Sequence, residues 1–167
     1  LIPELNRLID HEIELAKSGK QGRIILKMNA LQDPAMIERL YEASQAGVKT
    51  DLIVRGICCL IPGRKFSRNI RVTRIVDTFL EHARVWYFGN GGKPKLFLGS
   101  PDWMRRNLYR RIEAVTPILD PDLKRELSDM LSIQLSDKRK ACFVDDRLHN
   151  RWKSARPQKE KIRSQYT

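Results

Sequence analysis

Long apolar runs and phosphate-binding glycine loops are both missing from this sequence of 167 residues. The longest apolar stretches, such as Ile57 to Ile61, have the length of a strand. A membrane-spanning helix needs about 20 consecutive apolar residues, so we expect no transmembrane segment. The pattern GxxxxGK(S/T) does not occur either, which excludes a P-loop nucleotide site.

Cysteine is scarce, with three residues in the whole chain. Cys58 and Cys59 are adjacent, a geometry that forms a disulfide only with strain, and Cys142 is far away in sequence. No group of cysteines and histidines has the spacing of a zinc site. We therefore expect three reduced thiols, which fits a cytosolic protein.

Acidic residues are outnumbered, with 20 Asp and Glu against 32 Lys and Arg, for a formal net charge of +12. Such an excess predicts a polyanionic partner: nucleic acid, a phosphate polymer, nucleotides or an anionic membrane surface. Hydrophobic residues make up 41%, which is ordinary for a folded domain. The sequence begins with Leu1 rather than Met, and we expect it to be a piece of something longer.

Apolar periodicity and turn residues predict an alternation of helices and strands. We expect helices over residues 2–17, 34–46 and 72–81, with further helices starting at residues 101 and 121. Strands are expected over residues 23–28, 48–55, 83–88, 95–98, 110–118 and 140–144. This order favours an α/β sandwich whose sheet is parallel in its first half and mixed later, with helices on both faces.

Two residues near the ends of these elements are candidates for binding an anion. Arg55 ends an apolar strand and precedes a basic loop that contains Arg64, Lys65 and Arg68. Its planar guanidinium can hold a phosphate, and an ion pair with an acid on a helix is the alternative. His82 follows the helix predicted over residues 72–81, where the dipole favours an imidazolium, so it is a candidate acid or a helix cap.

Four long blocks resemble the C-terminal catalytic domain of bacterial polyphosphate kinase, the family that builds long polyphosphate from ATP. They are KMNALQDPAMIERLYEASQAGV at 27–48, DLIVRGICCLIPG at 51–63, NIRVTRIVDTFLEHARVWYFGNGG at 69–92 and LFLGSPDWMRRNLYRRIEAVTPI at 96–118. The resemblance implies a phospholipase D-like α/β fold, a mixed sheet sandwiched by helices. It places that domain at residues 1–146, followed by a basic C-terminal tail at residues 147–167.

The resemblance also implies a reaction. The family enzyme has four domains, of which this chain would be the last, and it reversibly transfers the terminal phosphate of ATP to polyphosphate. ATP or ADP and the polymer would meet in a basic tunnel with Mg²⁺, which residues outside this chain would mainly bind. The phosphate would pass through a phosphohistidine in a preceding domain, so the chain alone would be inactive. The intact enzyme would be a homo-oligomer in the cytoplasm, with peripheral attachment to the inner membrane as an alternative.

Three residues match functional positions of the family. Arg55 matches an arginine that contacts nucleotide phosphates, and Arg111, in the RRIE stretch, matches another arginine near the phosphates. His82 matches a histidine that binds phosphate and assists as a general acid. It is followed by Ala83-Arg84 rather than x-Lys, so the pattern HxKxxxxD is not intact and we do not expect His82 to be the nucleophile. Pro101 is a smaller departure, since the family usually has Ala there.

The alternative functions are a basic nucleic-acid-binding or nuclease-like module of the same fold, and a structural module without a site of its own. The aromatic residues Trp86, Tyr87, Phe88 and Trp103 lie in apolar strand and helix contexts. Core packing is therefore favoured over base stacking, and we expect no nucleic-acid partner.

Overall fold

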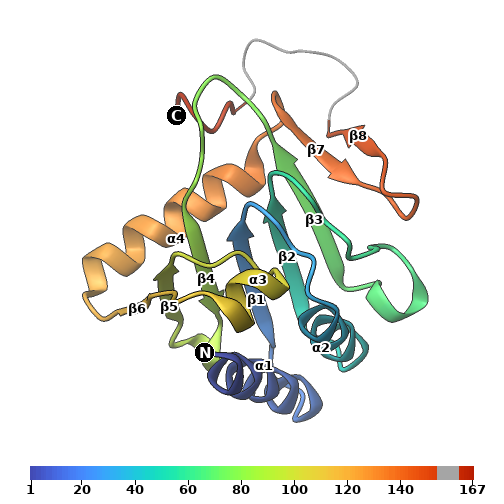
Figure 1. The fold of residues 1–167 in the computed structure, drawn as a ribbon, viewed down its shortest axis with the longest axis vertical. Helices are drawn as coiled ribbons and strands as arrows, with labels where there is room; N and C mark the ends of the chain where they lie inside the picture. Colours follow the sequence, from blue (N-terminus) through green and yellow to red (C-terminus); the bar gives the residue numbers. More distant parts are fainter. Residues whose placement is uncertain (154–161) are drawn as a thin grey trace.

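One mixed sheet runs through the computed structural model, which describes residues 1–153 and 162–167. Its strands are β1 (Arg23–Met28), β2 (Lys49–Val54), β3 (Ile70–Ile75), β4 (Arg84–Phe88), β5 (Lys95–Gly99), β6 (Val115–Ile118), β7 (Ala141–Val144) and β8 (Asn150–Trp152). Their order across the 8-stranded sheet is β6-β5-β4-β1-β2-β3-β7-β8 (Figure 1). The strands β1, β2 and β3 are parallel and all other neighbours are antiparallel. A sheet that is parallel in its first half and mixed later agrees with the prediction, although β3 itself was not predicted as a strand.

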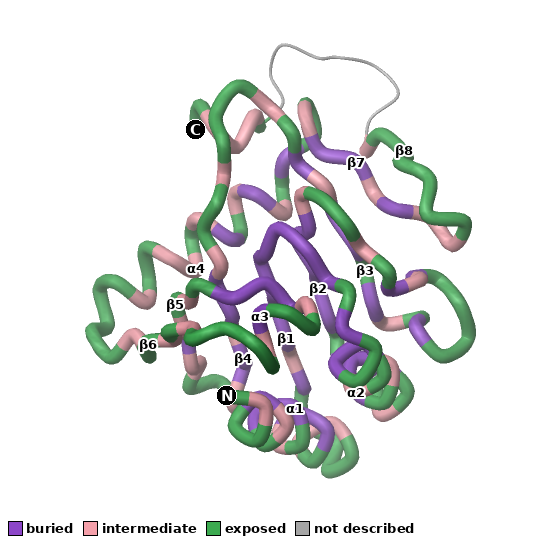
Figure 2. The backbone as a smooth tube through the Cα atoms, in the orientation of Figure 1, coloured by how far each residue is buried: buried purple, intermediate pink, exposed green. Residues whose placement is uncertain are grey.

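Helices cover both faces of the sheet (Figure 1). They are α1 (Ile2–Lys17), α2 (Pro34–Gln45), α3 (Arg105–Arg110) and α4 (Pro121–Ser136), with short 3₁₀ turns η1 (Lys65–Ser67) and η2 (Asn90–Gly92). The larger core packs α1 and α2 on one face, and a smaller core around Leu131 packs α4 on the other. The central strands β1 and β2 are the most continuously buried part of the backbone (Figure 2). No helix in the described part of the chain is long and apolar enough to cross a membrane.

Local capping explains where several elements begin. The side chain of Asp33 accepts a hydrogen bond of 3.0 Å from the backbone N–H of Met36, and Pro34 takes the first helical position of α2. Asp120 and Pro121 start α4 in the same way. These two starts, and the helix over residues 2–17, confirm the predictions from sequence.

The helix predicted over residues 72–81 is wrong, because residues 70–75 form β3 and the following residues have no regular structure up to β4. Val76, Phe79 and Leu80 are 62%, 59% and 71% exposed, so their helix-like spacing does not mark a buried helix face. The β-branched residues at 70–75 instead form a strand that pairs with β2 on one side and β7 on the other. We call residues 76–83 the His82 loop.

Two boundaries near α3 also differ from the predictions. The helix begins at Arg105 rather than at Pro101, because Asp102 and Trp103 are buried in an extended segment that bridges to Leu31. The strand predicted over residues 110–118 begins only at Val115, since α3 continues to Arg110.

The two edges of the sheet are formed by short strands. At one edge, β6 contains Pro117, which lies opposite Phe97 of β5. At the other edge, β8 spans residues 150–152 of the segment expected to be a basic tail. Arg156, Lys159 and Lys161 of that segment lie outside the described residues.

Candidate functional site

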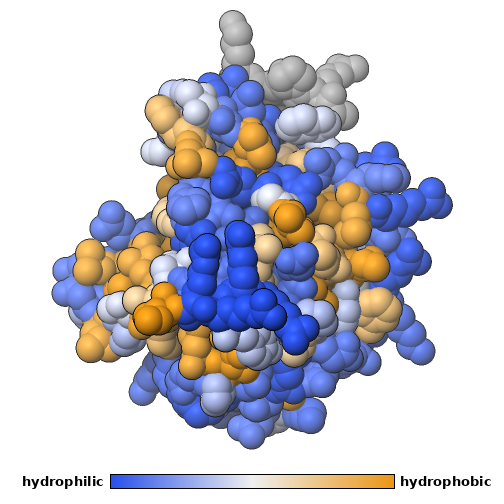
Figure 3. Space-filling view, in the orientation of Figure 1, coloured by the Kyte–Doolittle hydropathy of each residue, from blue (hydrophilic) through white to orange (hydrophobic). Residues whose placement is uncertain are grey.

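A polar pocket of about 730 Å³ lies at the carboxyl ends of β1 and β2, the edge where open α/β sheets usually bind ligands. Four segments contribute its walls: the residues after β1, those after β2, the end of the His82 loop together with Arg84 at the start of β4, and the stretch from Ser100 to Glu113 around α3. Hydrophilic side chains gather over α3 on this face of the molecule (Figure 3). The lining residues used below are Asn29, Arg55, His82, Arg84, Asp102, Arg106, Asn107, Arg111 and Glu113.

The structure brings the three sequence-predicted residues together, because Arg55, His82 and Arg111 all line this pocket. Arg55 follows β2 directly, and its Nε donates a hydrogen bond of 3.0 Å to Oδ1 of Asn29. The partner of Arg55 is therefore an amide rather than the helix acid considered as an alternative. Arg111 follows α3 and is exposed.

His82 has different neighbours from those the sequence suggested. The residues directly before His82 form an irregular loop and not a helix, so the predicted influence of a helix dipole is wrong. Its close polar neighbour is Arg84, whose Nη1 lies 2.9 Å from Nδ1 of the imidazole and 2.7 Å from the carbonyl oxygen of His82. In the sequence, Arg84 stands out only as a departure from a family pattern.

Asp102 is the main residue that sequence reasoning missed. Its Oδ1 accepts hydrogen bonds of 2.8 Å and 3.2 Å from the backbone N–H groups of Asn29 and Ala30, and both carboxylate oxygens accept from Arg84. Burial raises the pKa of the Asp102 carboxyl, but these hydrogen bonds outweigh burial and hold the pKa below its usual value. Asp102 is therefore an ionised anchor in the pocket wall.

Glu113 is the second carboxylate of the pocket. It accepts hydrogen bonds from Ser100 Oγ and, at 2.6 Å, from Asn107 Nδ2. The Ser100 bond lowers the pKa of Glu113, burial opposes this, and Asn107 and the nearby guanidinium of Arg111 lower it further. Glu113 is thus also ionised and already engaged by protein donors.

Cations outnumber anions in this pocket, where four arginines face two carboxylates. The amide nitrogen of Asn29 adds a donor, since it is buried in the pocket wall and has no hydrogen-bond partner among the described residues. Arginine forks and free N–H donors are the groups that phosphate oxygens prefer. The arrangement can bind a phosphorylated ligand and stabilise charge on it.

The side chains that the structure describes do not form a metal site. Within residues 1–153 and 162–167, no group of three or more His, Cys, Asp or Glu side chains is placed to hold a metal ion. The two carboxylates of the pocket are occupied by Arg84 and by Ser100 and Asn107.

Residues near the C-terminus make hydrogen bonds with the His82 loop. Arg163 makes two hydrogen bonds to the carboxylate of Asp77, and Gln165 both accepts from and donates to the backbone of Phe79. Gln165 also donates a hydrogen bond of 3.1 Å to Glu81, which is paired with the buried Lys27. The loop is therefore exposed but fixed at three positions before His82.

The basic side chains of the loop after Arg55 do not line this pocket. Arg64 instead donates to the backbone oxygen of Asp146 at 3.2 Å, and Arg68 lines a separate hollow at the opposite ends of β2 and β3. Lys65 is exposed in η1. Among the basic residues of this region, only Arg55 lines the pocket.

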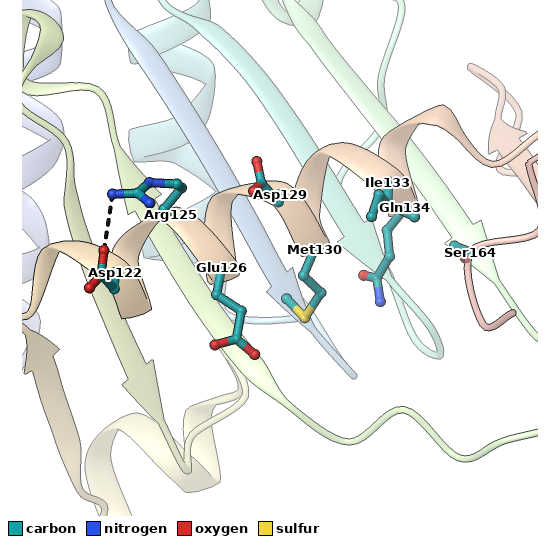
Figure 4. Close-up of a pocket in the computed structure, with 8 residues that line it drawn as sticks. All are labelled: Asp122, Arg125, Glu126, Asp129, Met130, Ile133, Gln134 and Ser164. Carbon is teal, nitrogen blue, oxygen red and sulfur yellow. Dashed lines mark hydrogen bonds and ion pairs between the residues drawn. The ribbon is translucent and has the colours of Figure 1, made fainter. Parts of the chain in front are cut away.

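A second groove of about 490 Å³ runs along α4 and differs in charge (Figure 4). Its acidic residues Asp122, Glu126 and Asp129 outnumber its one arginine, Arg125, which pairs with Asp122 at 3.0 Å. This groove does not suit a polyanion, whereas the pocket of Arg55 and His82 has an excess of positive charge.

The architecture defines the fold class of the protein. Nuc from Salmonella typhimurium, a phospholipase D family member, superposes with a TM-score of 0.53 at 16% identity, covering 74% of this chain and 84% of that chain. At such low identity the likeness concerns the fold alone, and the chain has a phospholipase D-like fold, as predicted.

Closer comparisons show the family. The family model described as polyphosphate kinase C-terminal domain 2 matches residues 1–165. A polyphosphate kinase from Thermosynechococcus vestitus is 55% identical over 136 residues, which cover 81% of this chain and 19% of that protein. The crystal structure of polyphosphate kinase from Porphyromonas gingivalis superposes with a TM-score of 0.96 at 54% identity, covering 99% of this chain and 26% of that chain. The chain belongs to the polyphosphate kinase C-terminal domain family, and it spans between a fifth and about a quarter of these relatives' length.

Proposed function

We propose that this chain forms one wall of the phosphoryl-transfer site of a polyphosphate kinase, which reversibly moves the terminal phosphate of ATP to polyphosphate. The observation that carries the proposal is the convergence of Arg55, His82 and Arg111 on one basic pocket at the carboxyl ends of the parallel strands. Family membership supplies the reaction, and the charge of the pocket agrees with it.

Phosphoryl transfer asks a protein mainly for positioning and for stabilisation of charge on the phosphate oxygens. In the proposed site, Arg55 and Arg111 bind these oxygens through their guanidinium groups. His82 binds phosphate and donates a proton or a hydrogen bond to the oxygen on which charge develops. These roles need no nucleophile in this chain.

The covalent step is proposed to occur on a histidine of a preceding domain. There, the bond from phosphorus to the bridging oxygen of ATP breaks as a bond to an imidazole nitrogen forms, and ADP leaves with the electron pair. In the second step a terminal oxygen of polyphosphate replaces the imidazole on phosphorus. The chain alone is accordingly proposed to be inactive.

Other parts of the proposal concern partners. Mg²⁺ would neutralise phosphate charge and would be bound mainly outside this chain, because the pocket carboxylates are occupied by protein donors. The intact protein is proposed to be a cytoplasmic homo-oligomer that binds ATP, ADP and polyphosphate.

The nucleic-acid alternative has no specific observation in its favour. Trp86 and Trp103 are 1% and 0% exposed and pack edge to face in the core, so they offer no surface for stacking bases. The shared fold with a phospholipase D family member does not itself carry a substrate.

Titration of the chain with polyphosphates of graded length tests the proposal. We expect binding that weakens at least tenfold in the variant Arg55→Ala/Arg111→Ala, which removes two charge-assisted contacts. Arg125→Ala, on the acidic groove of α4, is the matched control and keeps the native affinity. Equal losses in all variants, or tighter binding of DNA than of polyphosphate, would contradict the proposal.

A further inference from the structure

Arg84 has a specific relationship to the imidazole of His82. A guanidinium carries only N–H donors and stays protonated, so it cannot accept a hydrogen bond. The contact of 2.9 Å between Arg84 Nη1 and His82 Nδ1 therefore requires Nδ1 to accept through its lone pair. The neutral ring that fits this contact carries its hydrogen on Nε2.

Arg84 is itself fixed in place. Its Nε and Nη2 donate to the two carboxylate oxygens of Asp102 at 3.2 Å and 3.0 Å, in a fork geometry with side chains only 11% and 9% exposed. Asp102 is in turn bound by the backbone N–H groups of Asn29 and Ala30, which directly follow the central strand β1. A continuous chain of hydrogen bonds thus runs from the centre of the sheet to the His82 ring.

Most donors of Arg84 are used within the protein. Two point to Asp102, one to the imidazole and one to the carbonyl oxygen of His82, out of the five that a guanidinium has. Arg55 and Arg111, by contrast, line the same pocket without a carboxylate partner among the described residues. The geometry of Arg84 is that of a support for His82 rather than of a phosphate ligand.

We propose that Arg84, anchored by Asp102, is a positioning residue that holds His82 in one tautomer, with Nε2–H presented to the phosphate. The proposal deepens the function proposed above and rests on it for the role of His82. An exposed histidine in solution samples both neutral tautomers and several ring orientations. Fixing Nδ1 as an acceptor leaves one nitrogen, Nε2, to donate to the phosphate oxygen.

The tautomer can be measured without any activity. The 167-residue chain is labelled with ¹⁵N at its three histidines, and the ring nitrogens are observed at about pH 8.5, where free histidine is neutral. His82→Gln assigns the signal. We expect the native His82 to show an unprotonated Nδ1 and a protonated Nε2 as a single species.

Substitutions at Arg84 separate donor geometry from charge. Arg84→Lys keeps a group that only donates and is expected to retain the single tautomer. Arg84→Gln can both donate and accept, so it is expected to give a mixture. Arg106→Gln, which removes a charge from the same pocket with no contact to His82, is the control and keeps the native spectrum. A mixture in the native chain, or an unchanged spectrum in Arg84→Gln, would overturn the proposal.

Kinetics of the multidomain enzyme that contains this chain give a second readout. We expect Arg84→Ala to lower kcat about tenfold or more while KM changes little, and Arg84→Lys to recover part of the loss. The double variant Arg84→Ala/His82→Ala should be no slower than His82→Ala, because both changes remove one function. A raised KM at unchanged kcat would make Arg84 a substrate ligand and overturn the positioning role. A native rate in His82→Ala would instead remove His82 from the proposed function, whatever its tautomer.

Discussion

Arg163 binds both carboxylate oxygens of Asp77, through hydrogen bonds of 2.8 Å and 2.7 Å, although 86 residues separate the two in sequence. In the same C-terminal segment, Gln165 makes hydrogen bonds with the loop backbone, and the Tyr166 ring lies beside that of Phe79 with the ring centroids 5.6 Å apart. Residues 163–166 therefore hold the His82 loop in position.

Loss of this clamp should loosen the loop. We expect the variant Arg163→Ala/Gln165→Ala to increase amide hydrogen exchange in residues 76–83 at least tenfold, while exchange in β1 stays native, because local opening then needs fewer broken contacts. Mass spectrometry of peptides from the chain measures both. Arg125→Ala removes an exposed ion pair on α4 and serves as the control. Unchanged exchange in the loop would show that other contacts hold it.

Removal of either proposed phosphate-binding residue should slow the intact enzyme. In a full-length polyphosphate kinase containing this chain, we expect His82→Ala and Arg55→Ala each to lower turnover by at least ~10²-fold, as loss of a group that stabilises transition-state charge does. Release of labelled ADP and growth of polyphosphate measure the rate. Synthesis of polyphosphate by the 167-residue chain alone would refute the division of the site between domains.

Glu12 should be worth more to stability than an ordinary helix acid. Its carboxylate is fully buried and accepts hydrogen bonds from the backbone N–H groups of Arg23 and Asn90, at 2.9 Å and 2.6 Å. Glu12→Ala leaves both of these partly buried N–H groups without their partner, and an unsatisfied buried donor costs about 1–3 kcal/mol. Urea unfolding should show a clear drop for Glu12→Ala and little change for Glu14→Ala, an exposed acid on the same helix. Equal effects would assign the loss to helix propensity.

Acid should destabilise the chain partly through Asp137. Burial raises the pKa of this carboxyl, but hydrogen bonds from the backbone of Lys140, Ser164 and Arg139 outweigh it and lower the pKa from its ordinary value of 3.8. A carboxyl with a lowered pKa in the folded state stabilises that state above its ordinary pKa and loses the contribution as pH falls through the lowered one. We expect the free energy of unfolding to fall below about pH 4, and less steeply in Asp137→Asn. Parallel pH curves for the two proteins would contradict this assignment.

Much of the fold follows from local signals, because β-branched runs and Asp-Pro starts act within a few residues. The strand β1 and the beginnings of α2 and α4 are of this kind. The strand β3 was predicted as a helix, since Val72, Ile75 and Phe79 have helical spacing and only tertiary pairing decides for the sheet. Spacing alone cannot tell a buried strand that runs into an exposed loop from an amphipathic helix.

The candidate site was predictable in part. Arg55, His82 and Arg111 emerged from strand ends and from the family resemblance, and they share one pocket. The pair of Arg84 and Asp102 could not be found, because 18 residues separate them and the buried extended segment before α3 was interpreted as a helix start. This ion pair depends on how β4, β5 and the segment after β5 pack together.

The proline in β6 has a consequence for how this protein behaves at high concentration. An outer strand with free N–H and C=O groups can template the addition of strands from other molecules, which leads to aggregation. Pro117 has no N–H to offer, and the opposite edge ends in β8, a strand of 3 residues. Both borders of the sheet are thus poor templates, so copies of this basic domain can come close together without joining their sheets through new strand pairs.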